Sequence, residues 1–170
     1  SFWNDDDIPC VESMLNSPSP GSAPLGLYYH VPFCRKRCHF CYFKVYTDKN
    51  SAAVRRYLSA TMKELKAYAE SPYLQGRKPK FVYFGGGTPS YLSVQQLTEL
   101  TDEMKAILPW DEAEEVTFEC EPGTLSEKKL EVIKNFGVTR LSLGIENFND
   151  HILETNGRAH RSKEVFQAYE

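Results

Sequence analysis

The feature that most constrains the fold of this chain is an alternation, from Leu25 onward, between short apolar runs and longer amphipathic stretches. Four of the runs have the length and composition of strands, and the stretches between them have a helical period. The predicted strands are Leu25–Val31, Lys80–Phe84, Glu115–Cys120 and Arg140–Gly144. The predicted helices are Ala52–Glu70, Val94–Leu108, one that follows Ser126 and one that begins at Ser162. Strands alternating with helices are joined by right-handed crossovers, so the sequence predicts an α/β fold with a parallel sheet.

The chain divides into two regions of different composition. Asn16–Pro24 is rich in Pro, Ser and Gly, which predicts an N-terminal arm or linker over residues 1–24. Residues 25–170 are predicted to form one domain, with Ser93 and Ser126 as N-caps of two of its helices. Four βα units do not close a barrel, and the last helix has only begun where the sequence ends. We therefore interpret residues 25–170 as a domain truncated at its C-terminus.

Charge and hydropathy exclude several classes of protein. The net charge of −3 indicates neither a nucleic acid nor a membrane surface as partner. No apolar stretch approaches the roughly 20 residues that a membrane helix needs. Ser1–Cys10 is acidic and lacks the apolar segment of a signal peptide. We therefore expect a cytoplasmic protein that acts on a small molecule.

The cysteines are concentrated in one place. The chain has five, and Cys34, Cys38 and Cys41 lie within eight residues of one another, directly after the first predicted strand. An odd number and this close spacing argue against a disulfide framework and favour metal binding in a reducing compartment. Thiolates suit zinc or an iron–sulfur cluster, and electron-transfer clusters usually take four of them. Three thiolates leave one iron open, as a site that binds a further ligand requires.

A structural zinc site is the alternative for the same three cysteines. Its fourth ligand would come from His39, His30, Cys10 or Cys120. Zinc sites usually show a second pair of ligands after a spacer, and this sequence has none, so the cluster is favoured. The cationic run Arg35-Lys36-Arg37 is expected to lower the pKa of the neighbouring thiols.

Unusual residues also occur at the ends of the other three predicted strands. They are Gly85-Gly86-Gly87-Thr88-Pro89, Glu119-Cys120-Glu121-Pro122 and Gly144-Ile145-Glu146-Asn147. Ligands of parallel α/β folds bind at the carboxyl ends of the strands, so we expect these segments to share one rim with the cysteines. Glycines allow a ligand to approach the backbone closely. A cationic amino group would suit Glu119, and ribose hydroxyls would suit Glu146.

These motifs together resemble one family. Cys34-x3-Cys38-x-Phe40-Cys41 follows a Tyr-Tyr-His-Val-Pro-Phe strand and precedes Gly-Gly-Gly-Thr-Pro-Ser-Tyr-Leu, as in the radical S-adenosylmethionine (SAM) superfamily. The chain is most similar to the branch of oxygen-independent coproporphyrinogen III oxidase and its relatives. The further matching segments are Phe118–Leu125, Arg140–Phe148 and Gly157–His160, and the resemblance runs from Leu27 to the last residue.

The resemblance implies a fold, two cofactors and a reaction. The fold is a partial TIM-type (β/α)6 barrel, of which this chain holds about the first four βα units. Cys34, Cys38 and Cys41 would hold a [4Fe–4S] cluster whose open iron binds SAM. Reductive cleavage of SAM would yield methionine and a 5′-deoxyadenosyl radical that abstracts hydrogen from a substrate. The electron would come from a donor such as flavodoxin or ferredoxin.

The branch often binds two SAM molecules, and the resemblance assigns residues to each. Tyr28, Gly86 and Glu119 would contact the cluster-bound SAM. Phe40, Gly87, Thr88, Glu146 and Arg158 would contact the second. The alternative is core packing for Tyr28 and Phe40, and a surface charge for Arg158.

Two departures from the branch leave the substrate open. The oxidases proper have a further Cys shortly after the cluster motif, where this chain reads Cys41-Tyr42-Phe43-Lys44, and Glu146 replaces a usual Gln. The main hypothesis is a radical SAM enzyme, coproporphyrinogen III oxidase-like, that acts on a tetrapyrrole or another conjugated small molecule. The alternatives are a haem chaperone-like protein without oxidase activity, a radical SAM methylase or cyclopropane-forming enzyme of natural-product biosynthesis, and a zinc-stabilised binding domain.

Overall fold

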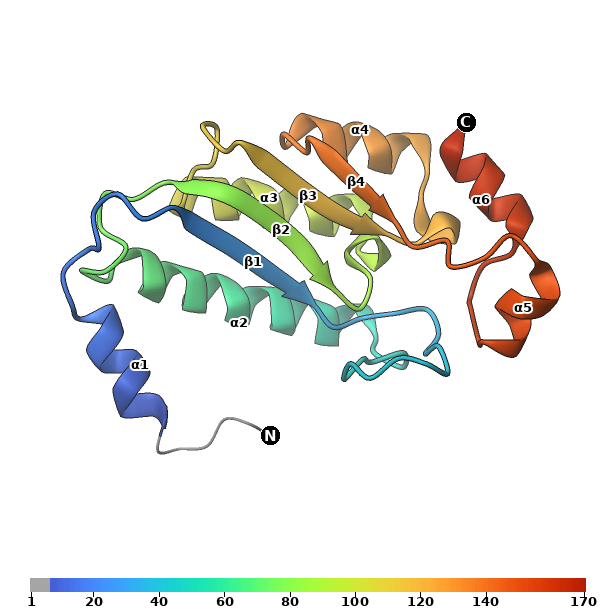
Figure 1. Ribbon diagram of the computed structural model, residues 1–170, viewed down its shortest axis with the longest axis horizontal. Helices are drawn as coiled ribbons and strands as arrows, with labels where there is room; N and C mark the ends of the chain where they lie inside the picture. The colour runs from blue at the N-terminus through green and yellow to red at the C-terminus, as the bar shows by residue number, and fades with distance from the viewer. Residues whose placement is uncertain (1–6) are drawn as a thin grey trace.

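A four-stranded parallel sheet organises the computed structural model, which describes residues 7–170. The strands are β1 (Leu25–Val31), β2 (Pro79–Gly86), β3 (Glu115–Cys120) and β4 (Arg140–Leu143). Each strand lies beside the next one along the chain, in the order β1-β2-β3-β4, and every pair is parallel. All four strands therefore end at the same edge of the sheet, where the cysteine-rich loop and the last two helices gather (Figure 1). The four predicted strands and their parallel pairing are confirmed.

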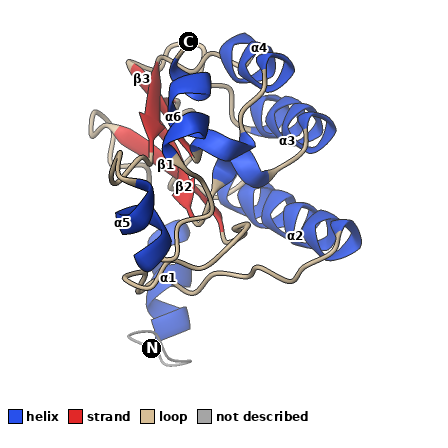
Figure 2. Ribbon diagram, turned by 90° about the vertical axis from the view of Figure 1, so that its right-hand side faces the viewer, coloured by secondary structure: helices blue, strands red, loops and turns tan. Residues whose placement is uncertain are grey.

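Three helices cover one face of this sheet, and the side view places them all on the same side (Figure 2). They are α2 (Ser51–Ala69), α3 (Val94–Ile107) and α4 (Glu127–Asn135). Local signals in the sequence set where they begin. The Asn50 side chain accepts a hydrogen bond from the Ala53 amide, and Ser93 forms a reciprocal capping box with Gln96. Ser126 caps α4, so both predicted N-caps are confirmed.

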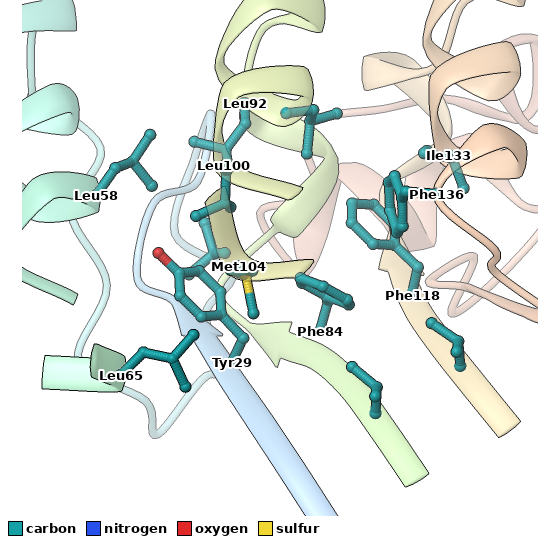
Figure 3. Packing of buried hydrophobic residues seen from close by; sticks show 14 of the residues in the cluster. Tyr29, Leu58, Leu65, Phe84, Leu92, Leu100, Met104, Phe118, Ile133 and Phe136 are labelled. Atoms are coloured by element: carbon teal, nitrogen blue, oxygen red, sulfur yellow. The ribbon is translucent and has the colours of Figure 1, made fainter. Parts of the chain in front are cut away.

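The core lies between the sheet and these helices, and aromatic side chains fill its centre (Figure 3). Phe84 of β2 and Phe118 of β3 are fully buried, with ring centroids 5.5 Å apart. Phe136, just after α4, packs against both at 5.5 and 5.7 Å. Each such pair contributes about 0.5–1.5 kcal/mol beyond its burial. This packing fixes β2 against β3 and so fixes the strand ends that carry the glycines and carboxylates.

The opposite face of the sheet is covered by no helix among residues 7–170 (Figure 2). Tyr28, Phe81 and Tyr83 point to this face, and 56%, 47% and 38% of their surfaces are exposed. Tyr28 and Tyr83 are register partners on neighbouring strands, with ring centroids 5.9 Å apart. The open face therefore presents adjoining aromatic side chains, of which Tyr28 and Tyr83 lie three residues before the ends of β1 and β2.

The structure contains elements that the sequence patterns did not predict. Helix α1 (Ile8–Leu15) lies within the predicted arm, and its Leu15 carbonyl accepts a hydrogen bond from the Tyr73 amide. Helix α5 (Asp150–Thr155) and the two 3-10 turns η2 (Pro89–Tyr91) and η3 (Pro122–Thr124) are too short to show a period. Helix α6 (Ser162–Tyr169) begins at the predicted residue.

Residues 1–6, the first part of the predicted arm, lie outside the described residues. Within residues 7–170, no helix combines the length and the hydropathy needed to span a bilayer.

Candidate functional site

A cavity of about 280 Å³ lies where the four strands end, between the sheet and the loop that carries the three cysteines. We call residues 34–46 the Cys loop. Ten of the eleven predicted site residues line the cavity. They are Cys34, Cys38, Phe40, Cys41, Gly86, Gly87, Thr88, Glu119, Glu146 and Arg158. The eleventh, Tyr28, stands on the open face of the sheet, and its hydroxyl lies 3.0 Å from Nδ1 of His30.

The Cys loop is fixed at its base, where its two ends meet, and at its tip around His39. Next to β1, the Cys34 amide donates to the Tyr46 carbonyl over 3.1 Å, and the Tyr46 amide donates to Pro32 over 2.8 Å. At the tip of the loop, the His39 amide donates to the Asn156 carbonyl just after α5. Nδ1 of His39 lies 2.8 Å from another α5 carbonyl, that of Thr155. These contacts hold the thiols over the cavity without a disulfide among the three cysteines.

Two of the thiols accept hydrogen bonds from predicted site residues. The Thr88 hydroxyl donates to Cys34 Sγ over 3.4 Å, and Nη1 of Arg158 donates to Cys38 Sγ over 3.2 Å. Burial raises the pKa of the Cys34 thiol above its ordinary value. The prediction that the neighbouring cations lower this pKa is wrong for Cys34. The main reason is desolvation of the partly buried thiol, and the Arg35 guanidinium is paired with Glu121 at 2.6 Å.

The glycine run is required by the packing around the cavity. Gly86 has a φ of +114°, and a Cβ at this position would lie 2.6 Å from the His30 ring. A Cβ at Gly87 would lie 2.9 Å from Cys34 Sγ and 2.9 Å from the Phe33 carbonyl oxygen. Only glycine therefore lets β2 end against the beginning of the Cys loop.

Glu119 is held in place by two donors from β2. The Gly86 amide donates to Oε2 over 3.2 Å, and the Tyr83 hydroxyl donates to Oε1 over 2.6 Å. This hydrogen bond to the carboxylate raises the pKa of Tyr83 to about 12, so the phenol remains a donor near neutral pH. A carboxylate accepts several hydrogen bonds, so Glu119 keeps capacity for a cationic group in the cavity.

A second cavity of about 210 Å³ adjoins the first, between the Cys loop and α5. Phe40, Glu146 and Arg158 line both cavities. Glu146 has a φ of +66°, a left-handed conformation that is uncommon outside glycine and that occurs at ligand sites. Nη2 of Arg158 donates to the Gly144 carbonyl over 2.5 Å, while its Nε is buried without a partner among the described residues.

The suggested alternative roles of three site residues are wrong. Phe40 and Tyr28 are each more than half exposed, so neither is a core residue. Arg158 contacts a site thiol across 120 residues of sequence and is therefore not a solvated surface charge.

The sequence patterns missed several residues around the cavity. Glu121 and His160 are both buried, and Arg35 joins Glu121 from the Cys loop. Glu121 stood within a motif that was singled out, but no periodicity indicates a pairing between residues 86 positions apart.

The comparisons with known proteins bear on these motifs directly. Residues 28–170 match the Radical SAM superfamily. The chain belongs to this superfamily. The matched range contains the three cysteines, the glycine run and all the remaining predicted site residues, and membership implies SAM and a [4Fe–4S] cluster as cofactors.

The relatives of this radical SAM chain include two named groups. It is 40% identical over 147 residues to the heme chaperone HemW of Bacillus subtilis, covering 84% of this chain and 37% of that protein. It is 29% identical over 157 residues to the oxygen-independent coproporphyrinogen III oxidase of Synechocystis, covering 92% and 33%. The solved structure of coproporphyrinogen III oxidase (HemN) from Escherichia coli superposes with a TM-score of 0.81 at 26% identity, covering 98% and 37%. The radical SAM chain thus spans about a third of the length of each.

The residues of the cavity fit the cofactors of the superfamily. Three thiols line one cavity, yet no three His, Cys, Asp or Glu side chains in residues 7–170 converge closely enough to hold a single metal ion. Nδ1 of His39 lies 2.8 Å from the Thr155 carbonyl oxygen, and Nδ1 of His30 lies 3.0 Å from the Tyr28 hydroxyl. Cys10 is exposed on α1. Three thiolates spread around a cavity suit a cluster of several irons better than one zinc ion.

Proposed function

We propose that this chain forms the SAM-binding and cluster-binding part of a radical SAM protein whose further ligand is a tetrapyrrole. One observation carries the proposal: three thiols, a glycine run and a carboxylate, from three different strand ends, line a single cavity. Cys34, Cys38 and Cys41 would hold the [4Fe–4S] cluster and leave one iron for SAM. The cluster and SAM, when bound, supply reductive cleavage of SAM to methionine and a 5′-deoxyadenosyl radical.

The chain's own residues would bind and orient SAM. Glu119, held by Tyr83 and the Gly86 amide, would accept hydrogen bonds from the SAM ammonium group. Tyr28 would flank the same SAM from β1.

A second SAM would occupy the space around the second cavity. The residues in reach of it would be Phe40, Gly87, Thr88, Glu146 and Arg158. The buried, unpartnered Nε of Arg158 and the strained backbone of Glu146 support a ligand there.

A tetrapyrrole is the substrate class that the relatives and the open sheet face both favour. The names of the two relatives contain heme or coproporphyrinogen, both tetrapyrroles. Tyr28 and Tyr83 form an exposed aromatic pair on the open sheet face, and the Tyr83 hydroxyl contacts the cavity residue Glu119. A flat conjugated molecule stacks well on such side chains. Hydrogen abstraction from the tetrapyrrole is the reaction we propose, as in a coproporphyrinogen oxidase-like enzyme.

A haem chaperone-like protein without oxidase activity is the second candidate. It is favoured by the 40% identity to HemW and by the sequence Cys41-Tyr42-Phe43-Lys44, which lacks the further Cys of the oxidases proper. A radical SAM methylase or cyclopropane-forming enzyme stays a prediction, and the names of these relatives add nothing to it.

An acidic electron donor, such as flavodoxin or ferredoxin, would dock on the Cys loop. Lys36, Arg37 and Lys44 are exposed there, and the loop contains no Asp or Glu, although the whole chain carries a net charge of −3. Complementary charges of this kind accelerate association and make it depend on salt. A reducing compartment such as the cytoplasm suits the five free thiols.

Cluster binding is tested on the full-length protein after anaerobic reconstitution. We expect about four irons and four sulfides in the wild type, and loss of most of both in Cys34→Ala. Cys10→Ala is the matched control, because Cys10 is exposed on α1 and should change nothing. Stoichiometric zinc without uptake of iron would contradict the proposal.

Two further assays separate the candidate functions. An oxidase-like enzyme should form 5′-deoxyadenosine with SAM, dithionite and coproporphyrinogen III, and its substrate should be consumed. A chaperone-like protein should bind haem in a titration and leave coproporphyrinogen III unchanged.

A further inference from the structure

Arg35 forms a bidentate ion pair with Glu121, a residue that lines the cavity. Nη2 of Arg35 donates to Oε1 of Glu121 over 2.6 Å, and Nε donates to Oε2 over 3.3 Å. Glu121 is only 7% exposed, and the Arg35 side chain is 34% exposed. Arg35 directly follows Cys34, and Glu121 directly follows the last residue of β3. The pair therefore joins the beginning of the Cys loop to the end of a central strand.

The guanidinium of Arg35 packs directly against the backbone of Gly123. A Cβ at Gly123 would collide with Nη2 of Arg35 and with Oε1 of Glu164. Glu164 lies 3.6 Å from the same guanidinium nitrogen and accepts a hydrogen bond from the Arg161 amide at the start of α6. Arg35 thus connects three segments: the Cys loop, the turn after β3 and helix α6.

His160 lies beside this pair without replacing Arg35 as the partner of Glu121. It is fully buried, and its Nε2 lies 3.1 Å from the Ile145 carbonyl. A carbonyl oxygen only accepts, so Nε2 must carry the proton of the neutral ring. Nδ1 then presents a lone pair 3.7 Å from Oε1 of Glu121, too far for a hydrogen bond. Removal of Arg35 would therefore leave a buried carboxylate without its charged partner, which is costly.

We infer that Arg35 and Glu121 are positioning residues, whose ion pair holds the Cys34 end of the Cys loop against β3 and α6 so that the thiols face the cavity. The contact itself depends on no cofactor. Its value for catalysis rests on the proposed function, because the thiols must hold the cluster. The same pair explains why a cation next to Cys34 does not face the thiol.

The test measures alkylation of each cysteine in the full-length apoprotein under anaerobic conditions, with iodoacetamide and mass-spectrometric mapping. In Arg35→Met and Glu121→Gln, we expect Cys34 to react about tenfold faster. Loss of a charge-assisted hydrogen bond makes local opening of the Cys loop more frequent, and the open loop exposes the thiol to the reagent. Urea unfolding of the same variants reports opening of the whole fold, and we expect its free energy to change too little to account for the faster reaction of Cys34. Exposed Cys10 serves as the standard for the reagent.

Two further variants make the test specific to the pair. The double variant Arg35→Met/Glu121→Gln should react no faster than the more reactive single variant, because both remove one interaction. Lys63→Met removes an exposed cation on α2, away from the cavity, and should leave every rate unchanged. Arg35→Lys keeps the charge and should restore part of the protection.

Two results would overturn the inference: an unchanged Cys34 rate in both single variants, or a fall in the free energy of unfolding that by itself accounts for the acceleration of Cys34. The second result would mean that the pair supports the whole fold and not the loop. Iron and sulfide content of the reconstituted wild type is measured separately. If the wild type takes up no iron, the proposed function fails, while the alkylation rates still decide whether the pair positions the loop.

Discussion

The Tyr83 hydroxyl lies 2.6 Å from Oε1 of Glu119, so one strand orients the carboxylate of the next. We expect Glu119→Gln to weaken SAM binding by about 1.5–3 kcal/mol, the contribution of a hydrogen bond to a charged group. Tyr83→Phe should weaken it by less, about 0.5–1.5 kcal/mol, because the carboxylate remains and only its orientation loosens. Calorimetry on the reconstituted full-length protein measures both affinities.

The control for these variants is Glu115→Gln. Glu115 lies at the other end of β3, where it accepts a hydrogen bond from the Thr117 hydroxyl. SAM affinity and cluster content should both remain at the wild-type level. Equal affinities of wild type and Glu119→Gln would show that Glu119 is not a SAM ligand.

Gly87, the last residue of the glycine run, packs against the thiol of Cys34 and leaves no room for an added methyl group. Its Cβ would lie 2.9 Å from Cys34 Sγ and 2.9 Å from two backbone oxygens, which give way less easily than a side chain. We expect Gly87→Ala to lower iron and sulfide content after reconstitution and to destabilise the apoprotein by about 1–3 kcal/mol.

Gly26→Ala is the matched control for Gly87→Ala. Gly26 lies on β1, and a Cβ there meets nothing within 4 Å. Stability should change little or rise slightly, and cluster content should stay constant. Iron content in Gly87→Ala equal to that of Gly26→Ala would contradict the close packing of Gly87 against Cys34.

Much of the fold followed from the sequence because its signals are local. The strand Glu115–Cys120 was predicted to the residue, and Ser93 begins α3 because its hydroxyl caps the helix. Most of the cavity lining followed as well, because the carboxyl ends of parallel strands meet at one edge. Any unusual residue at such an end is therefore brought near the others.

What the sequence did not predict depends on contacts between distant residues. The Arg35–Glu121 pair spans 86 residues, and neither residue lies in a pattern that indicates the other. Because burial of the Cys34 thiol raises its pKa, the predicted effect of the cationic run on this thiol was wrong. Helix α1 was missed because the Pro-, Ser- and Gly-rich segment Asn16–Pro24 led all of residues 1–24 to be interpreted as an arm or linker. Pro9 lies in the first turn of this helix, where Pro is favoured.

His160 should make stability depend on pH. Burial and the neighbouring Arg158 cation hold the pKa of His160 below its ordinary value of 6.5. The unfolded chain therefore binds a proton near pH 6.5 that the folded chain does not, and stability is lost as the pH falls below that value. Burial lowers the pKa of His30 in the same direction. Urea unfolding of the apoprotein at about pH 7.5 and about pH 5.5 measures the difference.

The His160→Gln variant isolates the contribution of this residue. Its amide can still donate to the Ile145 carbonyl but does not titrate near neutral pH, so the loss of stability in acid should be smaller than in the wild type. His151→Gln, at an exposed position on α5, should show the wild-type dependence. The same dependence on pH in wild type and His160→Gln would contradict the assignment.

Lys129 should stabilise the turn that carries Glu121. It is 8% exposed, and its Nζ donates to the Ser90 carbonyl over 2.6 Å and to the Thr124 carbonyl over 2.8 Å. Lys129→Met keeps the length of the side chain but leaves two carbonyls without their donor, at a cost of about 1–3 kcal/mol in the free energy of unfolding. Lys128→Met removes the same charge from the exposed side of α4 and should cost about 0.5 kcal/mol or less.

Lys129→Met should also affect the cavity, because Ser90 and Thr124, whose carbonyls accept from Lys129, both form hydrogen bonds with the Glu121 backbone. The Ser90 hydroxyl accepts a hydrogen bond from the Glu121 amide, and the Thr124 hydroxyl donates to the Glu121 carbonyl over 2.7 Å. A shift of this turn moves the carboxylate that anchors Arg35, so Cys34 should be alkylated faster in Lys129→Met than in Lys128→Met. Equal unfolding free energies and equal Cys34 rates in the two variants would show that the buried ammonium group supports neither the turn nor the Cys loop.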